Sequence, residues 1–149
     1  MKELIHVGFA GGNKIGEYVL TDGAYNDTSI TRLYGFKGER IDSTKDLTDS
    51  FCMELEKKGI SCIRGYHWTT DGGYVQPEWR GRYYLNDMGA KCVEMEGAGL
   101  FTIANFRSRK ATAIYVISDS GSNDEWDLGW GESTLENSIQ KLIAALARS

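Results

Sequence analysis

Three carboxylates in this sequence stand where side chains could do chemistry. Glu94 and Glu96 lie in the segment Val-Glu-Met-Glu-Gly at 93–97, and Asp119 follows the apolar run 113–117. The glutamates are two positions apart, so an extended backbone would project both side chains from one face. A carboxylate accepts hydrogen bonds through both oxygens, and a protonated one can act as a general acid. The pattern predicts a binding or acid–base site.

The elements around these carboxylates would place them at one edge of a sheet. Apolar residues on helical spacing predict a helix over 95–106, so the glutamates lie at a strand-to-helix junction. A buried strand is expected over 111–118, and the loop formers that follow Asp119 put this side chain at the strand's carboxyl end. Such edges are where α/β proteins hold ligands.

The rest of the chain alternates short strands with helical segments. This alternation predicts an α/β fold, a single domain over 1–149 with a central mixed and largely parallel β-sheet flanked by helices. The other expected elements are a strand over 4–10 ended by Gly11-Gly12, a neighbouring strand over 17–20, a helix from Ser43 to a stop at Gly59, a strand over 60–69, a helix from Pro77 to near Gly89, and a helix over 132–147 with Ser133 and Glu136 as a capping box.

Composition narrows the possible classes of function. A net charge of −4 argues against a nucleic-acid partner, and no apolar run approaches the ~20 residues of a membrane span. Three cysteines without a CxxC pair fit reduced thiols, so we expect a cytoplasmic protein. The two histidines lack the spacing of paired metal ligands, so no metal site is expected.

Several segments of the chain resemble the nucleoside phosphorylase superfamily. Its purine, uridine and methylthioadenosine branches carry a Val-Glu-Met-Glu segment and then a hydrophobic strand ending in Ser-Asp, as at 93–96 and 118–119 here. The segment Trp-Thr-Thr-Asp-Gly-Gly-Tyr at 68–74 resembles uridine-phosphorylase-like members. The opening at 6–12 looks like the middle of the family's proteins, so the resemblance covers their C-terminal portion, with the N-terminal segment missing.

The resemblance implies roles for individual side chains. Glu96 would accept hydrogen bonds from the vicinal hydroxyls of a ribose, and Glu94 would be a ribose contact or support one. Asp119 would hydrogen-bond the base and protonate its leaving nitrogen as a general acid. The remaining residues that it places beside the ligand are Met95 against the sugar, Tyr74 beside the base, and Ala10, Gly11 and Ser118.

The implied reaction cleaves the N-glycosidic bond of a purine or pyrimidine nucleoside to free base and ribose 1-phosphate. Inorganic phosphate would be the co-substrate, with no cofactor, and the enzyme would be a homo-oligomer. However, His6 and Phe9 stand where relatives have an arginine and a hydroxyl residue for phosphate. The alternative is a nucleoside-binding pseudoenzyme, or one half of a split enzyme whose partner chain supplies the N-terminal segment.

Without the resemblance, each residue also has a plainer interpretation. Glu94 and Glu96 would be a charge pair at a helix start, favoured by the helix dipole. Asp119 would be an ordinary loop residue after a strand. Tyr74 would be a turn residue that packs on Trp79.

Overall fold

Strands and helices alternate along most of the chain, as the sequence predicts. The computed structural model describes residues 2–73, 77–122 and 125–147. Its strands are β1 (Glu3–Gly12), β2 (Tyr18–Asp27), β3 (Arg40–Asp42), β4 (Ile63–Thr70), β5 (Cys92–Glu94), β6 (Lys110–Ser122) and β7 (Glu125–Asp127). Its helices are α1 (Ile30–Leu33), α2 (Lys45–Lys57), α3 (Glu78–Gly81), the π-helix η1 (Arg82–Asp87), α4 (Gly97–Phe106) and α5 (Ser133–Leu146).

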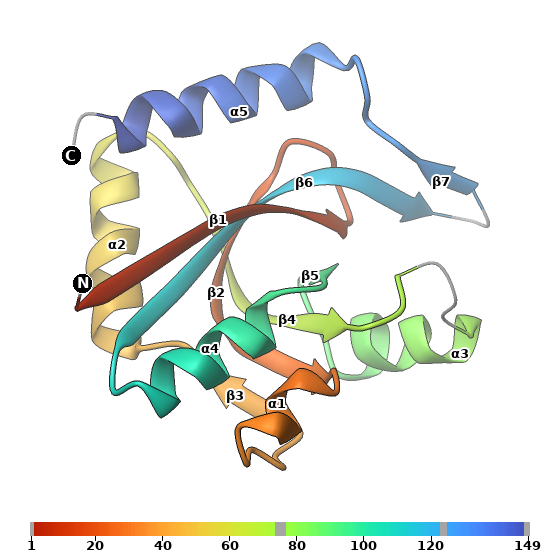
Figure 1. The fold of residues 1–149 in the computed structure, drawn as a ribbon. Coiled ribbons are helices and arrows are strands. Elements are labelled where there is room, and N and C mark those ends of the chain that lie inside the picture. Colours follow the sequence, from red (N-terminus) through yellow and green to blue (C-terminus); the bar gives the residue numbers. More distant parts are fainter. Residues whose placement is uncertain (1, 74–76, 123–124, 148–149) are drawn as a thin grey trace.

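The sheet closes on itself. Its strand order is β3-β2-β4-β5-β1-β6-β7, and an additional pairing of β2 with β6 joins five of these strands into a ring (Figure 1). The two longest ladders, β1–β6 and β2–β4, are parallel, whereas β2–β6, β1–β5 and the edge strands β3 and β7 pair antiparallel. The mixed α/β sheet flanked by helices is therefore confirmed. One expected neighbour is wrong, because β5 and β6 rather than β2 flank β1.

Two apolar clusters lie on the two faces of β6, because successive strand residues point to opposite sides. Ala113, Tyr115 and Ile117 join a cluster with α4, whereas Ile114 and Val116 pack under α2 and α5. Figure 1 shows α2 and α5 together on one side of the ring and α4 on another. The strand is buried on both faces, which explains its almost unbroken apolar sequence.

Helix ends follow local signals in some places and tertiary packing in others. Gly59 ends α2 as predicted: its φ is +74°, and the N–H of Ile60 reaches back to the carbonyl of Leu55 at 2.9 Å. The capping box at Ser133 and Glu136 does not form, because Ser133 is already the first residue of α5 and Glu132 is its N-cap, with no side-chain cap bond. The helix expected from Met95 begins at Gly97.

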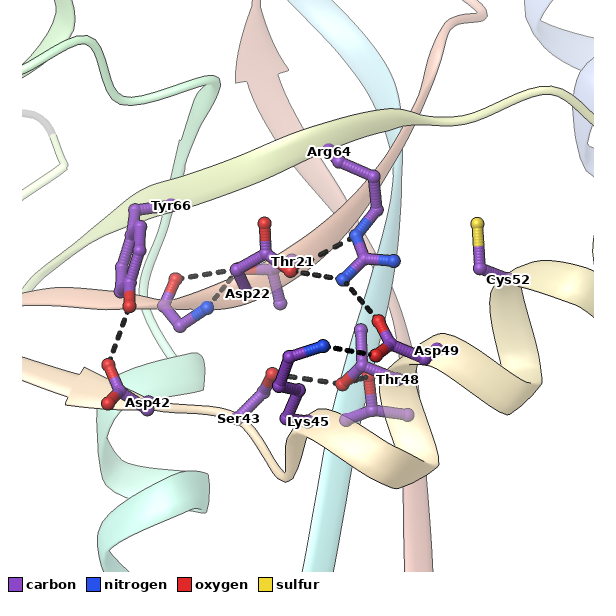
Figure 2. A network of polar contacts seen from close by, with 12 residues as sticks. Thr21, Asp22, Asp42, Ser43, Lys45, Thr48, Asp49, Cys52, Arg64 and Tyr66 are labelled. Carbon is purple, nitrogen blue, oxygen red and sulfur yellow. Dashed lines mark hydrogen bonds and ion pairs between the residues drawn. The ribbon is translucent and has the colours of Figure 1, made fainter.

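A polar network ties α2 to the sheet at the end away from Asp119. Figure 2 shows the Arg64 guanidinium of β4 lying between Asp22 of β2 and Asp49 of α2, and its Nη2 is 3.2 Å from Asp49 Oδ1. Deeper in, the Thr48 hydroxyl lies 2.9 Å from Ser43 Oγ and donates to Thr112 of β6 at 2.8 Å. These contacts fix α2 against β2, β4 and β6.

Candidate functional site

The paired glycines at the end of β1 bring two distant segments together. Gly11 pairs with Val93 of β5 on one side and with Asp119 of β6 on the other. The segment 94–97 and the Ser118-Asp119 pair are 21 or more positions apart in sequence, yet they flank the same strand end. The convergence that the sequence suggested is therefore present at this edge of the sheet.

Asp119 lies within β6 and not after it. The expected strand end is wrong, because Ser120 and Ser122 continue the strand by pairing with β7. The register shifts there: Ala10 pairs with Ile117 and Gly11 with Asp119, so Ser118 is the extra residue of a β-bulge. A bulge re-aims the side chains beside it. The Ser118 hydroxyl donates to Asp119 Oδ1 at 2.6 Å, and the carboxylate is partly exposed.

Glu94, the last residue of β5, is buried and its carboxylate is surrounded by donors. Oε2 accepts the backbone N–H groups of Glu96 at 2.8 Å and Gly97 at 2.7 Å, and the Tyr115 hydroxyl at 3.1 Å. Oε1 accepts the Thr69 hydroxyl at 2.5 Å and lies 3.0 Å from Nε2 of His67, whose side chain is fully buried. All acceptor capacity of this carboxylate faces the protein interior.

The charge of Glu94 is stabilised by these partners. Burial alone raises the pKa of a carboxyl group, but the His67 ring, the Thr69 hydroxyl and the Glu96 N–H outweigh it and lower the pKa of Glu94 to about 2. The carboxylate also lies at the N-terminus of α4, where a negative charge is favoured. Glu94 therefore caps α4 and fixes the turn at Met95 and Glu96, as the plainer interpretation of a helix-start charge predicts.

Glu96 has the opposite environment. It is the N-cap of α4, with φ −120° and ψ −34°, and both its side chain and that of Met95 are exposed. The expectation that Glu94 and Glu96 share one face is wrong, because β5 ends at Glu94 and the backbone leaves the extended conformation. Glu96 is thus the glutamate whose carboxylate is open to a ligand.

The other expected site residues lie around the same edge. Ala10 and Gly11 are buried at the end of β1, where their backbone is flanked by β5 and β6. Tyr74 lies outside the described residues. Gly73, which precedes it, is beside Met95: a Cβ added to this glycine would lie 3.5 Å from the Met95 sulfur. The loop after β4 therefore approaches the Met95–Glu96 turn.

A cavity of about 530 Å³ opens next to this edge, at the carboxyl ends of β2 and β4. Asp71 on its wall accepts hydrogen bonds from the Thr28 hydroxyl and from the N–H and hydroxyl of Ser29, the latter two at 2.8 Å. Neither Glu96 nor Asp119 lines this cavity. We therefore place the candidate site at Gly11, where β5 and β6 flank the end of β1, and regard the cavity as a separate, neighbouring feature.

Three residues that support the site are hardly marked in the sequence. His67, Thr69 and Tyr115 hold Glu94 from β4 and β6, and each looks like an ordinary strand residue. The only available signal was the placement of Thr69 in the segment 68–74. Within the described ranges, no three His, Cys, Asp or Glu side chains gather as metal ligands would. No described helix is long and apolar enough to cross a membrane.

Comparisons with known proteins agree with this architecture. The sequence profile of the phosphorylase superfamily matches residues 1–148. The chain is 31% identical over 152 residues to a purine nucleoside phosphorylase DeoD-type of Exiguobacterium sibiricum, covering 98% of this chain and 64% of that protein. It is 32% identical over 126 residues to the DeoD-type protein of Listeria monocytogenes, covering 80% of this chain and 52% of the relative.

Solved structures share the fold. The P knowlesi homolog of P falciparum PNP superposes with a TM-score of 0.77 at 20% identity, covering 99% of this chain and 62% of that structure. An AMP nucleosidase from Bacteroides thetaiotaomicron gives 0.69 at 22% identity, with the same coverage. The chain spans about half to two thirds of the length of these relatives. On the profile match over nearly its whole length, this chain belongs to the phosphorylase superfamily.

Proposed function

We propose that this chain binds a purine nucleoside at the Gly11 edge and cleaves its N-glycosidic bond, giving free base and ribose 1-phosphate. The observation that supports the proposal is the register of β1: Gly11 pairs with Asp119 on one side and on the other with Val93, three positions before the exposed Glu96. A nucleoside has a sugar and a base to be held at once. Two separate carboxylates at one edge suit that task.

Each carboxylate has a distinct role in this proposal. Glu96, exposed and held by the α4 N-terminus, accepts hydrogen bonds from the vicinal ribose hydroxyls through its two oxygens. Asp119 lies on the other side of Gly11 and donates a proton to the base nitrogen as the glycosidic bond breaks. Met95, exposed beside Gly73, packs on the sugar.

The proposed base and nucleophile follow the names of the relatives. The DeoD-type names of the relatives favour a purine, and phosphorolysis makes inorganic phosphate the co-substrate with no further cofactor. Because the chain spans only part of those proteins, their reaction is a proposal here. The expected homo-oligomer or partner chain and the cytoplasmic location also stay predictions. Light scattering and cell fractionation test them.

Nucleoside binding without turnover is a second candidate. His6 stands at the position where relatives have a phosphate-binding arginine, and its ring packs on Tyr115, with ring centroids 5.6 Å apart. Phe9, at the position of a hydroxyl residue, is 55% exposed on β1. Neither side chain offers the fixed positive charge or the hydroxyl that phosphate binding favours.

The decisive measurement is release of free base from a panel of nucleosides, followed by chromatography with and without inorganic phosphate. Phosphate-dependent release from adenosine, inosine or guanosine is the expected result. Release in water alone would replace phosphorolysis with hydrolysis. Calorimetric binding without any release of base would favour the second candidate. If the protein neither binds nor cleaves any nucleoside, both candidates are refuted.

Replacement of Asp119 by Asn tests the assignment of the acid. Because an amide cannot protonate the leaving base, Asp119→Asn should lower kcat by roughly 100-fold or more while nucleoside affinity changes little. Asp127→Asn is the matched control, since it makes the same change at an exposed side chain, that of Asp127 in β7. Equal kcat for the two variants would remove Asp119 from the mechanism.

A further inference from the structure

A buried histidine and a buried glutamate are in contact behind the candidate site. His67 is 0% and Glu94 is 5% exposed, and Nε2 of the ring lies 3.0 Å from Oε1 of the carboxylate. No step of the proposed reaction uses either group. Their pairing therefore needs a separate explanation.

The location of the protons follows from counting donors. The Thr21 hydroxyl donates its one hydrogen to the carbonyl of Gly23 at 2.6 Å, so its oxygen must accept from Nδ1 of His67 at 2.7 Å. Nδ1 thus carries a hydrogen. The Thr69 hydroxyl donates its one hydrogen to Glu94 at 2.5 Å, and its oxygen lies 3.2 Å from Nε2. Nε2 therefore faces two acceptors, this oxygen and Oε1 of Glu94, and must carry a hydrogen itself.

That proton belongs to the ring. A neutral imidazole with its hydrogen on Nδ1 would present a lone pair to the carboxylate across 3.0 Å. Four other donors point at Glu94, from Thr69, Tyr115 and the backbone of residues 96 and 97, so the carboxylate carries no proton of its own. The ring is therefore an imidazolium that donates from Nδ1 to Thr21 and from Nε2 to Glu94.

The same carboxylate connects the ring to the ligand edge. While Oε1 is held by His67, Oε2 holds the N–H groups of Glu96 and Gly97. Gly97 allows this close approach, because a Cβ there would lie 2.2 Å from Nε2 of His67 and 2.7 Å from the Tyr115 hydroxyl oxygen. Movement of Glu94 would thus move the Met95–Glu96 turn.

We propose that protonated His67 is a positioning residue of this site: it holds Glu94, and through Glu94 it fixes the turn that presents Met95 and Glu96 to the sugar. This inference rests on the proposed function for the identity of the ligand. Without the Nε2 donor, Glu94 loses its partner at 3.0 Å, so the turn loosens and nucleoside affinity falls.

The other titratable groups around the ring do not supply this hydrogen bond to Glu94. Cys92 of β5 and Glu96, the N-cap of α4, flank Glu94. From β6, the Tyr115 ring lies 5.1 Å from the imidazole, and His6 of β1 packs on that tyrosine. From α4, only the neutral Phe101 ring approaches among the described residues. Burial and the charge of Glu94 raise the pKa of the Cys92 thiol and of the Tyr115 hydroxyl, so both stay protonated at neutral pH.

Nuclear magnetic resonance of the ¹⁵N-labelled protein tests the proton directly. The expected His67 ring has two protonated nitrogens at neutral pH, and the backbone amides of Glu96 and Gly97 shift when the ring is replaced in His67→Asn. The chain has one other histidine, so His6→Gln identifies the His67 signals. A singly protonated His67 ring at neutral pH, or Glu96 and Gly97 amides that do not shift in His67→Asn, would overturn the proposal.

Two substitutions separate the two bonds of the ring. In His67→Gln the amide nitrogen replaces Nε2 and still donates to Glu94. In His67→Asn the shorter amide replaces Nδ1, so the bond to Thr21 remains and the bond to Glu94 is lost. We expect calorimetry with inosine to give near wild-type affinity for His67→Gln and a roughly ten- to hundredfold loss for His67→Asn.

Wild-type affinity for His67→Asn, or an equal loss of affinity in His67→Gln and His67→Asn, would refute the role of the Nε2 donor. If the wild type binds no nucleoside, the proposed function fails, whereas the ring protons and the Glu96 and Gly97 amides still decide whether His67 fixes the turn.

Discussion

Glu94 and Glu96 show how two identical residues, two positions apart, acquire different tasks. Glu94 is enclosed by five donors from β4, β6 and the start of α4, so its charge serves the structure. Glu96 lies in the turn that follows Glu94 and is exposed. An ionised group can be buried at this site only because hydrogen bonds replace its hydration. The buried Glu94 thus holds the exposed Glu96 in a fixed position.

The pKa of Glu94 predicts how stability depends on pH. The folded pKa of about 2 lies below the ordinary value of 4.5, so this group stabilises the fold fully above about pH 5 and loses that contribution as pH falls towards 2. Glu94→Gln should therefore destabilise the protein by about 3 kcal/mol at pH 7 and by much less at pH 3. Urea unfolding at both pH values measures the difference.

Glu54→Gln, on the exposed face of α2, is the control, and its stability should stay within about 0.5 kcal/mol of wild type at pH 7. A loss for Glu94→Gln that is the same size at pH 7 and pH 3 would contradict the assignment of a low pKa to Glu94.

At the scale of elements, the sequence predicts best what local chemistry decides. Gly59 ends α2 as expected, because a left-handed residue after a helix is a local requirement. The end of β6 was missed, since Ser120 and Gly121 are loop formers that stay extended only because β7 pairs with them. The edge with Glu96 and Asp119 followed from the resemblance and the strand pattern. The His67–Glu94 pair could not be foreseen, because 27 residues separate its members and only the sheet joins them.

The start of α5 offers a test of helix capping. Glu132 is the N-cap, in an extended conformation, and makes no side-chain bond to the first turn. Glu132→Asp supplies a shorter carboxylate that can accept the N–H of the second or third helical residue. We expect a gain of roughly 0.5–1 kcal/mol, seen as a rise in Tm of a few degrees by calorimetry. Glu132→Ala is the matched control and should give no gain; an equal rise in both variants would rule out capping as the cause.

At the scale of the whole molecule, closure of the sheet couples the two apolar clusters. Tyr18, Val19 and Leu20 of β2 pair with Val116, Tyr115 and Ile114 of β6, and all six are buried. Val19 and Tyr115 belong to the cluster under α4, whereas Leu20 and Ile114 belong to the cluster under α2 and α5. Because β2 and β6 each contribute side chains to both clusters, neither cluster is built on strands of its own. The chain should therefore unfold as one cooperative unit.

Leu20→Ala tests that coupling from one side of the ring. The side chain is fully buried under α2 and α5, so its truncation should cost about 2–5 kcal/mol. Hydrogen exchange should show this loss of stability equally at the slowly exchanging amides of β6 and at those of α4. The α4 helix packs on the cluster that does not contain Leu20. Leu33→Ala, at a side chain that is 84% exposed on α1, should change stability by less than about 0.5 kcal/mol. If α4 keeps its wild-type protection in Leu20→Ala, the two clusters unfold separately, and the closed ring does not bind them into one unit.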